Sequence, residues 1–156
     1  MFDLSSARFA FLDLESTGLS PWFGDRICEI GIVLTEGRRI KQQVQILVNP
    51  ERLLSLSAAS TSGLTDEQLS RAPLFEEVAD DVAEWLKGTV VVCHNAQFDV
   101  QFLDSEFRRL GREIQIPNLI DTPHNAWASR QARQRLIDQT AENLRAWSDG
   151  HPMRVV

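Results

Sequence analysis

The stretch from Phe9 to Gly18, FAFLDLESTG, decides the fold. Its apolar residues predict a buried strand, yet it carries two acids, Asp13 and Glu15. Side chains alternate between the two faces of a strand, so both acids point to one face while Leu12 and Leu14 point to the other layer. The acids also end the strand, just before a Ser-Thr-Gly loop. Open α/β sheets place their ligands at such strand ends.

An Asp-x-Glu pair on a strand most often marks a solvated edge. Here Phe9 and Phe11 precede the acids on the same face, so that face is apolar up to its carboxyl end. This context favours a functional pair over a solvated one.

Length and composition predict a single domain spanning residues 1–156, since a chain of this size can bury about two-thirds of its unfolded surface. No segment approaches the roughly 20 apolar residues of a membrane helix, and the first residues do not resemble a secretion signal. We therefore expect a cytoplasmic protein without membrane association. Cys28 and Cys93 lie in apolar runs, which favours core packing over a disulfide or zinc site. The net charge of −6 does not exclude a nucleic-acid partner, because bound divalent cations can reverse the local field.

The remaining patterns predict an α/β fold with a mixed sheet. Three antiparallel strands come first, and the wholly apolar run at 89–95 predicts a strand that is parallel to its neighbour. Residues 51–63 are irregular in pattern, whereas Thr65 and Gln68 form a capping box for a short helix. The expected elements are strands over 8–15, 25–37, 38–50, 89–95 and 113–122, and helices within 72–88 and over 96–110.

A third acid follows the apolar strand in the segment His94-Asn-Ala-Gln-Phe-Asp99. Alone, Asp99 would be an acid favoured by the helix dipole. The strand order, however, makes this segment a neighbour of Asp13 and Glu15. Clustered carboxylates repel one another unless cations neutralise them, and hard oxygen ligands suit Mg²⁺ or Mn²⁺. The three acids are therefore candidate metal ligands.

The segments FLDLESTGL, TSGLTDEQL and VVCHNAQFDVQFL, in this order, closely resemble the DEDDh 3′–5′ exonuclease superfamily. Its best-known members are the proofreading subunits of bacterial replicative DNA polymerases such as DNA polymerase III. The resemblance runs from about Arg8 to Thr122. It implies a ribonuclease-H-like fold, in which a mixed five-stranded sheet is flanked by helices.

The resemblance also implies roles for individual residues. Asp13, Glu15 and Asp99 would be the catalytic acids and would hold two Mg²⁺ or Mn²⁺ ions about 4 Å apart. The product would be a nucleoside monophosphate. Asp121 would be a structural acid near the site. The residues assigned to substrate binding are Thr17, Gly18, Leu19, His94, Asn95 and Phe98.

The family's third motif, a His followed five positions later by an Asp, is not intact. His124 is followed at that distance by Ser129, and His151 by Val156. The His of this motif serves as the general base in the family. We expect the part from about residue 123 to be atypical, truncated, or completed by another chain in a homo-oligomer. Residues 131–147 are expected to form a helix, with candidate core positions Trp127, Leu136, Ile137, Leu144 and Trp147 in this part of the chain.

Three functions remain open at this point. The first is a metal-dependent 3′–5′ exonuclease acting on the 3′ end of single-stranded DNA or RNA, with a DNA polymerase subunit as a further partner. The second is a catalytically impaired relative that binds nucleic acid or a polymerase. The third is a structural domain whose acids bind nothing. Leu19, Trp22 and Phe23 are available to stack on bases, and the resemblance favours DNA.

Overall fold

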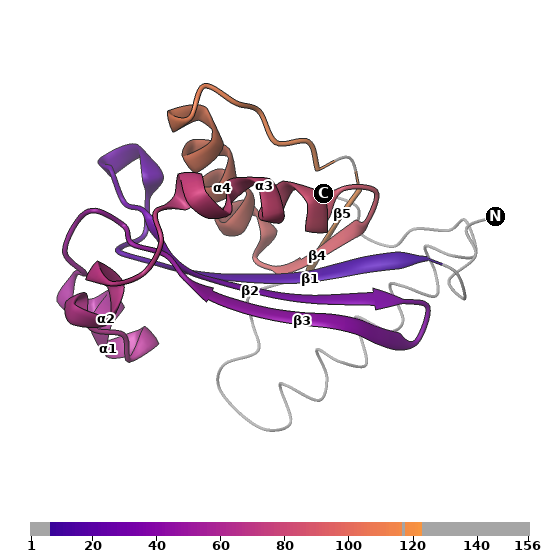
Figure 1. Cartoon of the computed structure of the whole chain (residues 1–156), viewed down its shortest axis with the longest axis horizontal. Helices are drawn as coiled ribbons and strands as arrows, with labels where there is room; N and C mark the ends of the chain where they lie inside the picture. Colours follow the sequence, from indigo (N-terminus) through magenta and orange to yellow (C-terminus); the bar gives the residue numbers. More distant parts are fainter. Residues whose placement is uncertain (1–6, 117, 123–156) are drawn as a thin grey trace.

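The computed structural model describes residues 7–116 and 118–122, which form a five-stranded mixed sheet with helices α3 and α4 on one face (Figure 1). The strand order is β3-β2-β1-β4-β5. This confirms the predicted mixed five-stranded sheet flanked by helices. The elements are β1 Arg8–Ser16, η1 Pro21–Phe23, β2 Ile27–Glu36, β3 Arg39–Leu47, α1 Leu56–Ser62, α2 Asp66–Ser70, α3 Phe75–Leu86, β4 Val90–His94, α4 Ala96–Arg109 and β5 Leu119–Thr122.

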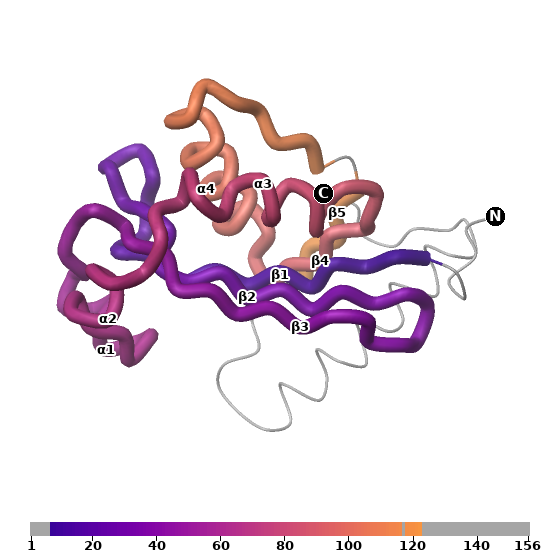
Figure 2. The backbone as a smooth tube through the Cα atoms, in the orientation of Figure 1, coloured from indigo at the N-terminus to yellow at the C-terminus, as the bar shows by residue number. Residues whose placement is uncertain are grey.

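The first three strands form an antiparallel meander, which Figure 2 shows running side by side. The turn between β2 and β3 places Glu36 opposite Arg39, and Gly37 adopts a φ of 56° there, a conformation that glycine tolerates best. The register of β1 on β2 places Asp13 opposite Gly31 and Glu15 opposite Glu29. The pairing of β1 with β2 therefore determines which β2 residue lies opposite each acid of β1.

Strand β4 runs parallel to β1, as its continuous apolar pattern predicts, and its pairing with β1 ends at Leu12 and Cys93. Helix α3 reaches β4 by crossing one face of the sheet. The core lies between that face and helices α3 and α4, where the rings of Phe75 and Phe107 meet edge to face with centroids 5.3 Å apart. Both cysteines are buried and free.

The opposite face of the sheet carries a smaller apolar cluster near the start of β1. Phe9 packs there with Val90 and Val92, and its ring also approaches that of Phe11. Phe11 is partly exposed, and Asp13 follows on the same face. The face thus changes from apolar to acidic along β1, as the sequence predicts.

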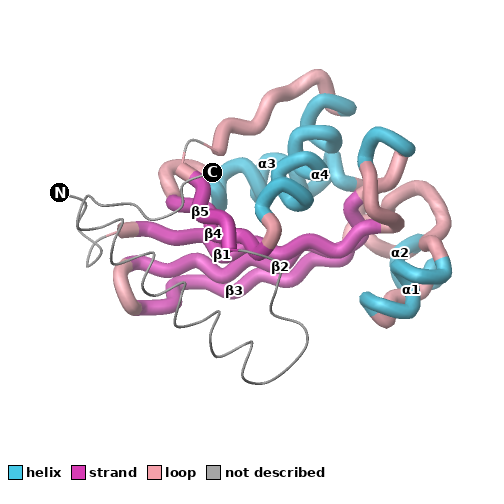
Figure 3. The backbone as a smooth tube through the Cα atoms, turned by 180° about the vertical axis from the view of Figure 1, so that it is seen from behind, coloured by secondary structure: helices cyan, strands magenta, loops and turns pink. Residues whose placement is uncertain are grey.

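Two expectations differ from the structure: the last strand, expected over 113–122, spans only Leu119–Thr122, and residues 51–63 include the helix α1. Ser55 caps it by accepting a hydrogen bond from the Ala58 N–H at 3.1 Å, and Gly63 ends it in the left-handed conformation. The helix has no buried residue, so it lacks the apolar periodicity by which amphipathic helices are detected. The capping box of Thr65 and Gln68 on α2 is confirmed. Figure 3 shows α1 and α2 at one end of the sheet, away from α3 and α4.

The predictions for His124, His151 and the helix over residues 131–147 lie outside the described residues. Within 7–116 and 118–122, no helix is both long enough and apolar enough to cross a membrane.

Candidate active site

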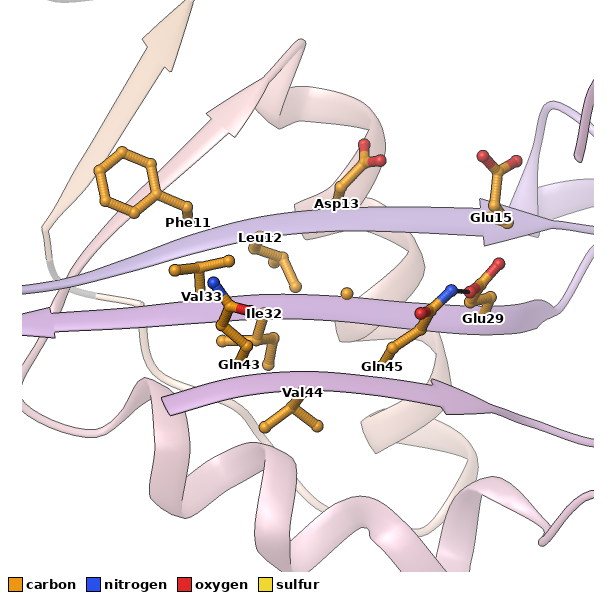
Figure 4. Close-up of a pocket in the computed structure, with 11 residues that line it drawn as sticks. Phe11, Leu12, Asp13, Glu15, Glu29, Ile32, Val33, Gln43, Val44 and Gln45 are labelled. Atoms are coloured by element: carbon orange, nitrogen blue, oxygen red, sulfur yellow. Dashed lines mark hydrogen bonds between the residues drawn. The ribbon is translucent and has the colours of Figure 1, made fainter. Parts of the chain in front are cut away.

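The two acids of β1 lie on one face of the sheet near the carboxyl end of the strand. Figure 4 shows Asp13 and Glu15 on the same side of β1 as Phe11, with Glu29 of β2 beside Glu15. The opposing residue of Asp13 is Gly31, which has no side chain, so the space next to the Asp13 carboxylate is open. These residues line a groove of about 730 Å³ that extends over β2 to Gln43 and Gln45 of β3.

Asp99 of α4 reaches the backbone of β1 between the two acids. Its Oδ1 accepts a hydrogen bond from the Leu14 N–H at 3.1 Å, and the residue is only 2% exposed. The ladder between β1 and β4 ends at Leu12, so the Leu14 N–H lies beyond the last pairing with β4. The fold therefore brings this acid to β1, as the sequence predicts.

The electrostatic state of the three acids is unfavourable in the absence of a cation. Burial, followed by the charge of Asp13, raises the pKa of Asp99 to about 7, and Asp121 adds to this rise. Partial desolvation also raises the pKa values of Asp13 and Glu15, and Glu29 adds to both shifts. His94 acts in the opposite direction on the pKa of Asp13. The site thus holds more negative charge than the protein compensates.

The chemistry of this donor set fits a hard divalent cation, which carboxylate oxygens bind and whose charge would remove the mutual repulsion. Among the described residues, no group of three His, Cys, Asp or Glu side chains is already arranged to hold a metal ion. The assignment of Asp13, Glu15 and Asp99 as metal ligands therefore stays a prediction.

The segment between β4 and α4 is shaped by β5. His94 Nδ1 lies 3.1 Å from Thr122 Oγ1, and Asn95 adopts a left-handed conformation with φ of 62°. Asp121 accepts a hydrogen bond from the Ala96 N–H at 2.8 Å, which holds the first turn of α4. This contact gives Asp121 the structural role that the resemblance implies.

Phe98 is half-buried on the first turn of α4, where its ring centroid lies 4.7 Å from that of Phe102. This ring contact positions Phe98, which directly precedes Asp99 in the chain. Its predicted role in substrate binding has no further test in the described contacts.

The loop after β1 exposes apolar side chains at the end of the sheet where β1 ends. Thr17 is buried and Gly18 is half-buried, whereas Leu19 is 87% exposed. Trp22 and Phe23 of η1 are also exposed, at 77% and 87%. Figure 1 shows η1 at the same end of the sheet as the carboxyl end of β1. Trp22 lines a second pocket together with Asp104 and Arg108 of α4, separate from the groove that Asp13 and Glu15 line.

The sequence analysis missed two acids, one beside Glu15 and one at the other end of α4. Glu29 faces Glu15 across the hairpin, and Gln45 donates a hydrogen bond to its carboxylate. Glu106 is 2% exposed and binds Arg26 through Nε at 2.7 Å and Nη2 at 2.9 Å. The signal for Glu106 was its place on the apolar side of α4, in phase with Phe102 and Leu103.

Comparison with known proteins identifies the family of this chain. The family model described as Exonuclease matches residues 10–151. DNA polymerase III subunit epsilon of Rickettsia felis is 36% identical over 124 residues, covering 76% of this chain and 54% of that protein. DNA polymerase III PolC-type of Caldanaerobacter subterraneus is 37% identical over 108 residues, covering 69% of this chain and 8% of that protein. The chain spans about half the length of the epsilon subunit it matches.

Solved structures share the fold at low sequence identity. A product-bound exonuclease I has a TM-score of 0.67 at 17% identity and covers 74% of this chain and 30% of that one. E. coli exonuclease I in complex with a dA16 oligonucleotide has a TM-score of 0.66 at 19% identity, with 74% of this chain and 28% of that one covered. The family match over residues 10–151 and the identity to epsilon subunits together place this chain in the exonuclease family.

Proposed function

We propose that this chain acts as a metal-dependent 3′–5′ exonuclease that removes nucleotides from the 3′ end of DNA. The observation that carries the proposal is the docking of Asp99 on the β1 backbone between Asp13 and Glu15. Asp13 and Glu15 line an open groove, and Asp99, from a distant segment, is buried against the strand that carries them. Membership of the exonuclease family and the likeness to epsilon subunits support this activity.

The proposed roles follow from position. Asp13, Glu15 and Asp99 would hold Mg²⁺ or Mn²⁺, two ions per site. Ions bound there would activate a water molecule and neutralise the charge that develops on the phosphate. The chain's own contribution is to orient the three carboxylates, two through the pleat of β1 and one through the hydrogen bond to Leu14.

The substrate would lie with its terminal nucleotide against the loop after β1. Thr17, Gly18 and Leu19 would seat the sugar and base, and the exposed rings of Trp22 and Phe23 are suitable for stacking. His94, Asn95 and Phe98 would border the same nucleotide at the start of α4. The product of each step would be a nucleoside monophosphate.

In this proposal residues 1–156 form one exonuclease-like domain of a cytoplasmic protein. A DNA polymerase subunit is the proposed partner, because the relatives are named as subunits of DNA polymerase III. Single-stranded DNA is the proposed substrate because E. coli exonuclease I has been solved with a dA16 oligonucleotide. RNA remains the alternative substrate.

The test is hydrolysis of 5′-labelled single-stranded DNA and RNA in Mn²⁺, with the products resolved by length. Stepwise shortening from the 3′ end, release of nucleoside monophosphates, and loss of both in Asp13→Ala are expected. The matched control is Glu84→Gln, an exposed acid on α3 that pairs with Lys87 and lines neither the groove nor the pocket beside Trp22. Endonucleolytic fragments, or full activity in Asp13→Ala, would contradict the proposal.

A second candidate is the catalytically impaired relative that binds nucleic acid or a polymerase. It is favoured by Ser129 and Val156, which stand where the third motif has its Asp. The assay therefore includes Ser129→Asp and Val156→Asp, each of which restores the spacing of His and Asp in the third motif. Activity in only one of these variants would identify His124 or His151 as the general base. Oligonucleotide binding without hydrolysis in every variant would establish the second candidate.

A further inference from the structure

Asp25 connects three parts of the loop that follows β1. Its Oδ1 accepts a hydrogen bond from Thr17 Oγ1 at 3.1 Å, and its Oδ2 accepts one from the Ser20 N–H at 3.1 Å. Thr17 in turn accepts a hydrogen bond from the Arg26 N–H at 3.1 Å, and its own N–H donates to the Arg26 carbonyl at 2.9 Å. One carboxylate thus ties the beginning, middle and end of the loop together.

The same carboxylate lies directly beneath Gly18. A Cβ built on Gly18 would stand 2.6 Å from Cγ of Asp25, far closer than real Cβ contacts. A side chain at position 18 would therefore displace the Asp25 carboxylate, so this close approach, and not a positive φ, favours glycine there. The two residues form a single tightly packed unit.

The loop held by Asp25 carries apolar side chains, and exposure of such side chains to water is unfavourable. Leu19, Trp22 and Phe23 project into solvent, although burying them would be favourable. The hydrogen bonds to Asp25 oppose a collapse of the loop, because collapse would leave the Thr17 hydroxyl and the Ser20 N–H without these partners. Arg52 Nη1 lies 3.4 Å from Asp25 Oδ1, but its side chain is 40% exposed, so this ion pair contributes little.

We infer that Asp25 is a positioning residue, which holds the loop from Thr17 to Ser20 in the shape that receives the terminal nucleotide. The inference rests on the proposed function. Asp25 does not itself contact the substrate, and the three acids of the site do not depend on it. Its loss should therefore weaken substrate binding and leave the chemical step intact.

The size of the effect follows from the number of hydrogen bonds. Two hydrogen bonds of ordinary strength bias a two-state loop by roughly 10- to 30-fold. The apparent affinity falls by the fraction of loops in the competent shape. Asp25→Ala should raise KM for single-stranded oligothymidylate in Mn²⁺ by about 10-fold, with kcat unchanged. Asp25→Asn keeps one accepting oxygen, so its KM should lie between the KM of the wild type and that of Asp25→Ala.

Two controls separate positioning from general stability. Arg52→Ala removes the ion pair and keeps both hydrogen bonds, so KM should not change. Val82→Ala opens a cavity in the core under α3, where Val82 is fully buried, and should lower the melting temperature without raising KM. The second readout is amide hydrogen exchange. Asp25→Ala should accelerate exchange at Ser20 and Arg26, while amides at the centre of β2 keep their protection.

An unchanged KM in Asp25→Ala overturns the inference, whether or not the amides of Ser20 and Arg26 exchange faster. A rise in KM of equal size in Val82→Ala also overturns it, because the effect would then follow stability. If the wild-type chain does not hydrolyse the oligonucleotide, the proposed function fails. Exchange at Ser20 and Arg26 then decides by itself whether Asp25 holds the loop, and unchanged exchange rejects it.

Discussion

Replacing Asp99 by Asn should stabilise the metal-free protein at pH 8 and abolish hydrolysis. The side chain of Asn keeps an oxygen that can accept the hydrogen bond from the Leu14 N–H, so the connection between α4 and β1 survives. What disappears is a charge that is buried beside Asp13. The substitution therefore separates the charge of Asp99 from its packing.

The magnitude follows from the pKa of Asp99. Burial raises this pKa from 3.8 to about 7. A shift of about three units, at about 1.36 kcal/mol per unit, corresponds to roughly 4 kcal/mol of unfolding free energy. Because the folded pKa lies above the unfolded one, the folded protein binds more protons between about pH 4 and pH 7. Stability should therefore fall as the pH rises through this window, and Asp99→Asn should remove most of the fall.

The assay is urea unfolding in EDTA at pH 5 and pH 8, followed by tryptophan fluorescence. The wild type should lose roughly 2.6 kcal/mol of unfolding free energy between the two pH values, because the unfolded carboxyl is already mostly ionised at pH 5, and Asp99→Asn should lose much less. Asp104→Asn on the same helix removes an acid that pairs with Arg108 near the surface, so its pH profile should match the wild type. A wild type that is equally stable at both pH values, or an unchanged profile in Asp99→Asn, would refute the reasoning.

Three further outcomes are expected. Asp13→Ala should abolish hydrolysis while its melting temperature in EDTA equals or exceeds that of the wild type, since one of several repelling acids is gone; a large drop would assign Asp13 to structure. Mn²⁺ at about 100 times its dissociation constant should stabilise the wild type at pH 8 by about 2.7 kcal/mol, measured by thermal unfolding, and should not stabilise Asp99→Asn to the same extent. Glu106→Ala should cost about 3 to 5 kcal/mol in urea unfolding, because it leaves the Arg26 guanidinium without its buried partner. Glu84→Ala, which breaks an exposed pair with Lys87, should cost less than about 1 kcal/mol, and equal costs for the two variants would contradict the role of burial.

Local patterns were enough to predict most elements of the fold. The alternation of β1 placed Asp13 and Glu15 on one face, and the continuous apolar run of β4 predicted a parallel neighbour. The apolar spacing of α3 and the capping box of α2 were equally informative. Each of these signals involves only residues that are close together in the chain, so each can be recognised from the sequence alone. Helix α1 was missed because it rests on its caps alone and buries nothing.

Contacts between distant segments required the tertiary structure. Asp99 and Leu14 are 85 positions apart, and Arg26 and Glu106 are 80 apart. The sequence identified Asp99 as an acid at a helix start, but only the packing of α4 against β1 decides which backbone N–H its carboxylate meets. Gly18 and Asp25 look like ordinary loop residues until the fold brings the carboxylate beneath the glycine. Alternation and propensity act along the chain, whereas the partners of a side chain depend on how whole elements pack, and no local pattern records that choice.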